Sequence, residues 1–525
     1  MKFAAMYCLY DDYEYLDISL ESFKNIDKIL FLISDVPWNG NKDQRNNIDT
    51  INHVKNLCNK NSNYELITGH WINEINQRNF GLSKLFKENY DYTFIIDNDE
   101  IYHDYHIENI KKFILSNTKY SAFHIEWNTY WKKDYYIIHP RENFNPVIVV
   151  KISEYLFTTI RLGTTNIKRA GPAIFRVENN NEYNGILIPS NVAICYHLSY
   201  ARTDNFIKRK LETNSHASEF IKNWYEDVWK KWIPSMQNLH PVTPEQYKIA
   251  VKENFPSFPV QLQRFIKKEK CKKCSIIVLN WNSCQLLKEC LKLIEENTIN
   301  INYEVIIVDN GSKNDSSVDY LKSLNKNSYS FPFKVIYNEK NLGFPGGMNV
   351  GMKAADPNSD ICLLNVDAKV QKDWLKNLYD TMIDIPDCGL VGPLGNEKNY
   401  QHEGMVKKDT IVPNLHFFCV LIFRELINKI GFLDTQYGIG EYEDQDYCIR
   451  ARLAHYSICI SAKSLVKHKP HQVFELNSMD YNEFLKENRI KFLEKYVSNM
   501  LVYSNFFDFY YDPELNQSLK LTITD

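Results

Sequence analysis

An order of residues that occurs twice along this chain of 525 residues is the strongest constraint on its fold. In each half, an apolar run ends in a polar segment that contains an aspartate. Asn79 precedes Asp97 by 18 residues, and Asn349 precedes Asp367 by the same interval. One interval shared by two distant parts of a chain is better explained by a repeated architecture than by chance.

A histidine completes the order in each half. His197 follows Asp99 after 98 residues, and His468 follows Asp367 after 101 residues. A chain of this length has room for at least two domains. The pattern therefore predicts an N-terminal domain over 1–240 and a C-terminal domain over 274–475, joined by a connector over 241–273.

Apolar runs of strand length open both halves. They are Phe3–Tyr10 and Lys28–Ser34 in the first half, and Val278–Asn282 and Val305–Ser312 in the second. Nearly continuous apolar runs of this length are typical of parallel strands that are buried on both faces of a sheet. We therefore predict the α/β class, with one Rossmann-like sheet in each domain.

Polar residues end these strands in the second half. Asn280 and Asn282 end the first strand, Asp309 ends the second, and Asn365 ends a later apolar run. Open α/β sheets bind ligands outside the carboxyl ends of their strands, so Asp309 is placed to accept a hydrogen bond from a ribose or a pyrimidine. The alternative is that Asp309 only caps the helix that follows it.

Glycines gather between these strands, before a helical pattern. Gly343, Gly346 and Gly347 precede Asn349 in the segment NLGFPGGMNVGM. Glycine lets the backbone approach a flat or anionic ligand closely, although such a segment alone does not identify the ligand.

Two side chains of the second half are candidate metal ligands. Asp367 ends an apolar strand, and hard divalent cations such as Mg²⁺ and Mn²⁺ prefer oxygen ligands. His468 ends another apolar run and suits Mn²⁺ better than Mg²⁺, while a structural role is the alternative for a lone histidine.

Four carboxylates lie within the six residues from Glu441 to Asp446. Acidic residues in the first turn of a helix interact favourably with its dipole, which is one interpretation of the cluster. Neighbouring carboxylates also repel each other, so that one of them has a raised pKa and can act as a general base toward a sugar hydroxyl.

The order SIIVLNWNS, VIIVDNGS, NLGFPGGMNVGM, LLNVDA and YEDQDYCIR resembles the inverting family 2 glycosyltransferases of the GT-A fold, particularly their rhamnosyltransferase-like branch. The resemblance implies that Asp309 contacts the nucleoside and that Asp367 and His468 hold the metal on the donor diphosphate. It also implies that Asp444 is the catalytic base, with Glu443 beside it. The residues that it places along the donor are Asn280, Asn282, Gly343, Gly346, Gly347, Asn349 and Asn365.

The first half resembles a diverged copy of the second. By this resemblance Asp97, Asp99 and His197 form a metal site, and Arg78 and Asn79 contact a donor. No acidic pair stands at 170–176, where the base cluster is expected. Glu126 and Glu142 are the alternative candidates for a base in this half.

The resemblance implies a bifunctional, metal-dependent enzyme of the hexosyltransferase type. It would transfer sugars from UDP- or dTDP-sugar donors to a glycan, a lipid-linked glycan or a protein in the synthesis of cell-surface glycans. One alternative is a single active C-terminal domain with a pseudo-catalytic, acceptor-binding N-terminal domain. The other is a sugar nucleotidyltransferase, which is disfavoured because Asp11-Asp12 and Asn280-Trp281-Asn282 follow the first strands in place of a glycine-rich loop with Arg and Lys.

Composition restricts the partners and the compartment. The 62 Lys and Arg against 65 Asp and Glu give a net charge of −3, which disfavours nucleic acid as a partner. No apolar run, including Phe417–Phe423, is long enough for a membrane helix. Acidic residues follow the N-terminus too early for a signal peptide, and the 12 cysteines are typical of reduced core residues. We expect a cytoplasmic location, and a position at the inner face of the membrane is the alternative.

The segment 476–525 is expected to be a C-terminal extension, with a helix from Phe484 to Tyr496 followed by the aromatic cluster NFFDFYYDP. Three interpretations compete for this cluster: packing onto the second domain, a homodimer contact and a peripheral contact with a membrane surface.

Overall fold

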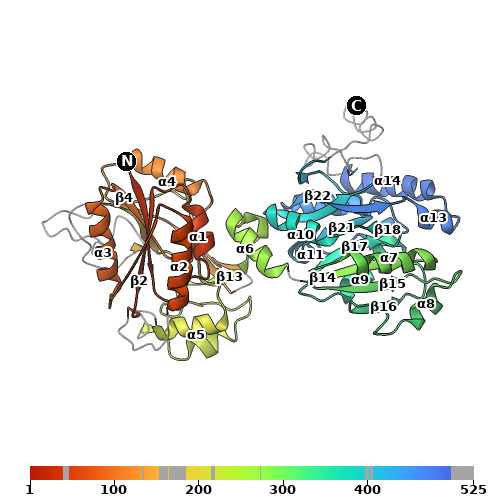
Figure 1. Ribbon diagram of the computed structural model, residues 1–525, viewed down its shortest axis with the longest axis horizontal. Coiled ribbons are helices and arrows are strands. Elements are labelled where there is room, and N and C mark those ends of the chain that lie inside the picture. The colour runs from red at the N-terminus through yellow and green to blue at the C-terminus, as the bar shows by residue number, and fades with distance from the viewer. Residues whose placement is uncertain are drawn as a thin grey trace. The chain divides into compact units, whose positions relative to one another are not determined.

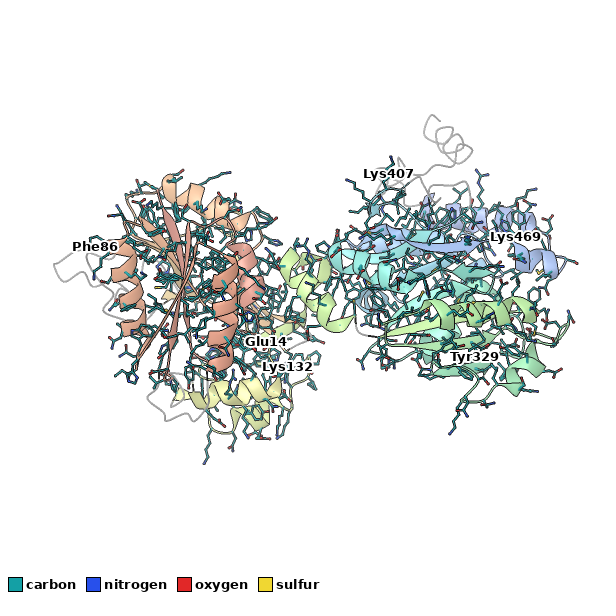
Figure 2. The ribbon with its side chains drawn as sticks, viewed as in Figure 1. Glu14, Phe86, Lys132, Tyr329, Lys407 and Lys469 are labelled. Atoms are coloured by element: carbon teal, nitrogen blue, oxygen red, sulfur yellow. The ribbon has the colours of Figure 1, made fainter. Side chains whose placement is uncertain are left out.

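The computed structural model describes residues 1–38, 47–132, 135–152, 163–164, 185–213, 219–271, 273–396, 401 and 406–497. It divides the chain into two compact units, Met1–Leu262 and Gln263–Asp525. In both units, side chains fill the space between the sheets and the helices (Figure 2). No helix in this described part is both long and apolar enough to cross a membrane.

The N-terminal unit is built on a mixed sheet with a parallel centre. β1 pairs in parallel with β2 and β4, and β9 continues the sheet antiparallel to β4. In Figure 1, α3 lies on one side of these strands, and α1 and α2 lie on the other. The order is β11 (Gly185–Leu187), β6 (Ala122–His124), β9 (Asn145–Lys151), β4 (Tyr92–Ile96), β1 (Phe3–Leu9), β2 (Lys28–Ser34) and β3 (Tyr64–Gly69), with β10 (Gly163–Thr164) paired to β9. The helices beside it are α1 (Leu16–Ser22), α2 (Ile48–Lys60), α3 (Glu74–Lys87) and α4 (His106–Leu115).

A smaller sheet follows in the same unit. Its order is β13 (Ile249–Lys252), β8 (Tyr136–His139), β7 (Trp127–Trp131), β12 (Cys195–Tyr200) and β5 (Glu100–Ile101). An aromatic cluster around Trp131 and Trp229 packs against it, together with α5 (Asp204–Thr213) and the π-helical turn Tyr225–Trp229. The predicted connector 241–273 is therefore not a plain linker, because its residues 249–252 form a paired strand and Val260–Lys270 forms α6.

The C-terminal unit has one large mixed sheet. β14 pairs in parallel with β15 and β17, and β21 then runs antiparallel to β17. The order is β16 (Phe333–Tyr337), β15 (Tyr303–Asp309), β14 (Cys274–Asn280), β17 (Asp360–Asn365), β21 (Cys419–Ile422), β19 (Cys388–Leu394), β22 (Ser457–His468) and β18 (Ala368–Val370), with β20 (Thr410–Ile411) paired to β22. The helices are α7 (Cys284–Asn297), α8 (Ser317–Ser323), α9 (Gly343–Ala354), α10 (Trp374–Asp384), α11 (Arg424–Ile430), α12 (Glu443–Leu453), α13 (Gln472–Leu476) and α14 (Tyr481–Val497).

The two sheets share one sequence of pairings. A central strand, β1 or β14, is flanked by two parallel strands, and an antiparallel strand, β9 or β21, follows the later of these. The parallel strands are apolar and buried, and all seven residues of β1 are buried. The predicted α/β class is confirmed, because apolar strands of this kind need helices on both faces to exclude water.

The C-terminal helix is also confirmed. It runs over Tyr481–Val497, where we expected 484–496. Phe492 and Tyr496 are buried against Tyr437 and Tyr442, so α14 packs on the segment that leads into α12. The aromatic cluster of residues 505–513 lies outside the described residues.

Candidate active site

The carboxyl ends of the strands in the C-terminal unit open into a pocket of about 350 Å³. The acids of α12 and the pair Asp367 and His468 line the same pocket. Phe344, Phe417, Phe418 and Phe474 supply apolar walls. A concave site with apolar walls and a few convergent polar groups is the usual form of a small-molecule site.

Strand pairing brings Asp367 and His468 together. Ala368 in β18 pairs with His468 in β22, so that the preceding residue, Asp367, lies beside the imidazole. The Oδ1 atom of Asp367 lies 3.3 Å from Nε2 of His468. The ring of Phe418 stacks on that of His468, with 5.0 Å between the ring centroids, and fixes its orientation.

The donor atoms of this pair fit a divalent cation. Asp367 is buried, and its Oδ1 has no hydrogen-bond partner among the described residues. Asn365, two residues earlier, also has a buried amide oxygen with no hydrogen-bond partner among the described residues. A buried carboxylate oxygen is costly to leave unsatisfied, and a metal ion would satisfy it. No group of three or more His, Cys, Asp or Glu that could hold a metal occurs in the described ranges, so the protein offers two ligands here.

Helix α12 presents the acidic cluster at its first turn. Glu441 and Tyr442 both have left-handed backbone conformations, with φ of 79° and 74°, and Glu443 begins the helix. Glu443 is 7% exposed, and one of its carboxylate oxygens has no partner among the described residues. The turn therefore directs carboxylates into the pocket instead of into solvent.

Burial and mutual repulsion raise the pKa values of these acids. Burial raises the pKa of Asp444 to about 6, while the backbone N–H of Gln445, 2.7 Å from Oδ1, opposes the rise. Burial, followed by the charges of Asp444 and Glu441, raises the pKa of Glu443 well above its usual range. Burial and Asp444 raise the pKa of Glu441 to about 7. Burial and the neighbouring charges therefore favour the protonated forms of all three acids.

Asp309 and the asparagines near it hold the loops at the strand ends. Asp309 is 1% exposed, and its carboxylate accepts hydrogen bonds from Asn280 Nδ2 at 2.9 Å and from the backbone N–H of Ser312 at 3.1 Å. Asn282 accepts from the backbone N–H of Lys313 at 2.8 Å. The predicted contacts of Asp309, Asn280 and Asn282 with a donor stay predictions.

The glycine segment forms most of α9. Gly346, Gly347 and Asn349 are not among the described residues that line the pocket, and their predicted donor contacts stay predictions. A Cβ atom on Gly347 would lie 2.4 Å from Cδ1 of Leu279, so this glycine allows α9 to pack closely on β14. Asn349 instead bonds both backbone groups of Leu433. Gly343 does line the pocket.

Sequence reasoning missed other residues at the pocket. Asn310 and Asn341 line it and are joined by a hydrogen bond of 2.8 Å between their side chains. Both lie inside motifs of the sequence, VIIVDNGS and NLGFPGGMNVGM, but were not named as site residues. His416 also lines the pocket, with Nδ1 3.9 Å from Oδ2 of Asp444, and nothing in the sequence marked it.

The N-terminal unit does not bring its predicted metal ligands into one cluster. Nε2 of His197 lies 3.9 Å from Oδ1 of Asp99, whereas Asp97 pairs with Arg78 at 3.6 Å. The described residues contain no cluster of three such ligands, and arginine side chains pair with both of these carboxylates. The predicted three-residue site stays a prediction. Asn79 lies on α3, next to Arg78, and its donor contact stays a prediction.

The two alternative bases of this unit differ in their surroundings. Glu142 is buried beside Thr129, whose hydroxyl donates to it, and burial raises the pKa of Glu142 to about 7. Glu126 is partly exposed and pairs with Arg141 at 3.0 Å. Residues 170–176 lie outside the described ranges.

The sequence model of the family described as "Glycosyl transferase family 2" matches residues 275–431. No curated protein matches the chain at a significant level. Among solved structures, the chain is similar to S. aureus TarS at 20% identity, over 39% of this chain and 38% of that one, with a TM-score of 0.30. The chain thus spans well under half the length of that protein.

Two further structures show a comparable likeness. For S. aureus TarS 1-349 in complex with UDP-GlcNAc, the identity is 17%, the coverage 46% of this chain and 77% of that one, and the TM-score 0.33. For GalNAc-T7 with UDP, GalNAc and Mn²⁺, the identity is 14%, the coverage 49% of this chain and 52% of that one, and the TM-score 0.33. A likeness of this degree carries no conclusion about activity. The matched segment, by contrast, contains β14, β15, α9 and Asp367, and the C-terminal unit of this chain therefore contains a glycosyl transferase family 2 domain.

Proposed function

We propose that the chain is a metal-dependent glycosyltransferase whose C-terminal unit transfers a sugar from a nucleotide-sugar donor with inversion at the anomeric carbon. One observation carries the proposal. A single pocket, lined in part by the segment that matches the family 2 model, contains both the buried pair Asp367 and His468 and the acids Glu443 and Asp444. Asp367 and His468 could bind the divalent cation of a diphosphate, and Glu443 and Asp444 could activate a hydroxyl.

Asp444 acts as the general base in this mechanism. Its pKa of about 6 leaves it ionised near neutral pH, so it can accept the proton of an acceptor hydroxyl as that oxygen attacks the anomeric carbon. Glu443 keeps its proton to higher pH, because burial and the charges around it favour its neutral form. A protonated Glu443 can donate a hydrogen bond to the acceptor.

Asp367 and His468 would hold a divalent cation, Mn²⁺ or Mg²⁺, which neutralises charge on the departing nucleoside diphosphate when it is bound. Asn365 adds an amide oxygen at the same end of the pocket. Phe417 and Phe418 reduce the access of water, which competes with the acceptor hydroxyl.

The substrates belong to the same proposal. A UDP- or dTDP-hexose is the donor class that the family resemblance favours. The acceptor is a hydroxyl on a glycan, a lipid-linked glycan or a protein.

We also propose that the N-terminal unit is a second unit of the GT-A type. The order of strand pairings that the two sheets share supports this, and so does the register of the strand that carries the late histidine in each unit. His197 pairs with Glu100, the residue after Asp99, just as His468 pairs with Ala368, the residue after Asp367. Two such units would let one chain add two sugars in succession. The alternative is that the N-terminal unit binds acceptor without catalysis.

The test is nucleoside diphosphate release across a panel of UDP-, dTDP- and GDP-sugars with Mn²⁺, using the full chain. We expect Asp444→Asn and Asp367→Asn to reduce release from the same donor by at least 10²-fold, a loss typical of a general base or of a group that holds the metal. Asp380→Asn, on the exposed face of α10, is the matched control. Unchanged release in both site variants would refute the assignment of this pocket.

The same panel separates the two hypotheses for the N-terminal unit. If Asp99→Ala abolishes release from a donor that Asp367→Asn leaves unaffected, the chain is bifunctional. If Asp99→Ala changes release from no donor, the N-terminal unit is a binding unit.

A further inference from the structure

Two aspartates occupy corresponding places in the two units and have different partners. Asp99 and Asp367 each precede a short strand that pairs antiparallel with the strand of the late histidine. Each has that histidine as a neighbour, at 3.9 Å in the N-terminal unit and at 3.3 Å in the C-terminal unit. Equivalent geometry would predict equivalent metal sites.

Among the described residues, His468 is the ion-pair partner of Asp367. In the described part of the chain, no lysine or arginine forms an ion pair with its carboxylate, and its Oδ1 accepts no hydrogen bond. A divalent cation there would meet a carboxylate whose negative charge is otherwise uncompensated by a fixed side chain.

Asp99 already faces a fixed cation. Nη2 of Arg202 lies 3.6 Å from Oδ2 of Asp99, and the Arg202 side chain is 0% exposed. The guanidinium is held by Asp12 at 2.9 Å and by Glu14 at 3.0 Å, and it lies 4.1 Å from the ring centroid of Tyr15. Glu14, labelled in Figure 2, follows β1 in the chain. Arg202 therefore cannot swing away without losing several charge-assisted contacts.

The charge of this guanidinium does not depend on pH in the working range. Burial opposes it, but the carboxylates of Asp12 and Asp99 more than compensate and raise the pKa of Arg202. Lys210 also lies near Asp99: burial lowers the pKa of Lys210, the charge of Asp99 opposes this shift, and Nζ of Lys210 donates to the carbonyl of Ser199 at 3.3 Å.

Asp97, the other aspartate of this segment, also has an arginine as its partner. Asp97 pairs with Arg78, whose side chain is 4% exposed and is also paired with Glu74. Buried arginines thus take up both carboxylates that we had predicted as metal ligands. A divalent cation placed on Asp99 would lie close to a permanent like charge in a poorly solvated region.

We propose that the chain holds one divalent cation, at Asp367 and His468, and that in the N-terminal unit Arg202 takes the place of a metal beside Asp99. A ligand of the N-terminal unit therefore binds without a divalent cation. The inference rests on the proposed function only for the metal at Asp367.

The test is a titration of the full chain with Mn²⁺ alone and in the presence of UDP, followed by the electron paramagnetic resonance signal of free Mn²⁺. We expect one bound ion per chain in the wild type. Asp367→Asn should abolish this binding, and Asp99→Asn should leave it at one. Two ions in the wild type, with one lost in Asp99→Asn, would overturn the inference.

A gain of binding gives a second test. In Arg202→Gln the neutral side chain should admit a second Mn²⁺, and the double variant Arg202→Gln with Asp99→Asn should return to one. A folded Arg202→Gln that still binds one ion would contradict the role given to the guanidinium. If Arg202→Gln does not fold, the stoichiometry of Asp99→Asn decides alone. The inference would be overturned if Asp367→Asn retained the wild-type ion and Asp99→Asn lost it. Turnover that persists in Asp444→Asn would count only against the proposed function.

Discussion

Replacing Asp446 by asparagine should loosen the C-terminal helix α14 from the helix that carries the candidate base. Asp446 is 0% exposed and lies in the first turns of α12. Its Oδ2 accepts from Nε of Arg450 at 2.8 Å, and its Oδ1 accepts from the hydroxyl of Tyr496 at 2.7 Å and pairs with Lys495. One carboxylate thus joins α12 to the last turn of α14.

The expected cost follows from what the amide leaves behind. Removing one partner of a buried ion pair typically costs about 3–5 kcal/mol. Arg450 and Lys495 are 20% and 30% exposed, so water screens part of that loss, and Lys495 keeps Asp434 at 2.7 Å. We therefore expect Asp446→Asn to destabilise the contact between α12 and α14 by about 2–3 kcal/mol.

Hydrogen–deuterium exchange of the full chain measures this locally, by peptides that cover α12 and α14. A loss of this size should speed exchange in both helices by about 30–150-fold if opening is at equilibrium. Tyr496→Phe, which removes one bond to a charged group, should cost about 1.5–3 kcal/mol. Asp380→Asn is the control, because the Lys376–Asp380 pair is exposed at 48% on both sides and should cost under about 1 kcal/mol. An effect of Asp446→Asn no larger than that of Asp380→Asn would refute the reasoning.

Three further predictions follow from single sites. Nucleoside diphosphate release should fall about tenfold per pH unit below about pH 6, because protonation of Asp444 removes the base; a flat profile down to pH 5 would contradict its role. Gly343→Ala should cost more than about 3 kcal/mol in urea denaturation, since its Cβ would collide with the carbonyl of Gly438. Gly431→Ala, also at positive φ but with open space around its Cβ, should cost about 1–3 kcal/mol. Equal costs would exclude the collision. Lys267→Met should cost about 2–4 kcal/mol in thermal unfolding, because Nζ donates to three backbone carbonyls, and an unchanged transition would mean that water replaces it.

Much of the C-terminal site could be predicted because its residues lie at strand ends. Asp367 and His468 lie at the ends of apolar strands, where α/β sheets gather ligand contacts, and the pairing of β18 with β22 then brings the two side chains together. The acidic neighbours of Asp444 marked this cluster in the sequence, and the role of Asp444 as a base stays a prediction. In each case a local pattern determines the location of the side chain.

The remaining features depend on contacts between distant segments. Gly347 and Asn349 looked like ligand contacts, yet their direction depends on which face of α9 meets β14 and Leu433. Arg202 lies 103 residues after Asp99 in the sequence, and no spacing rule connects them. Its effect on Asp99 needs the pairing of β5 with β12.

The extent of the sheet has a practical consequence for protein engineering. The family match ends at residue 431, before Glu443, Asp444 and His468. β22 lies between β19 and β18 in the sheet, so a fragment cut at that boundary would expose an apolar strand edge and lose the candidate base and one proposed metal ligand. Expression of the C-terminal unit, or its transplantation into another chain, therefore has to include the sequence through Val497, although the segment that matches the family is much shorter.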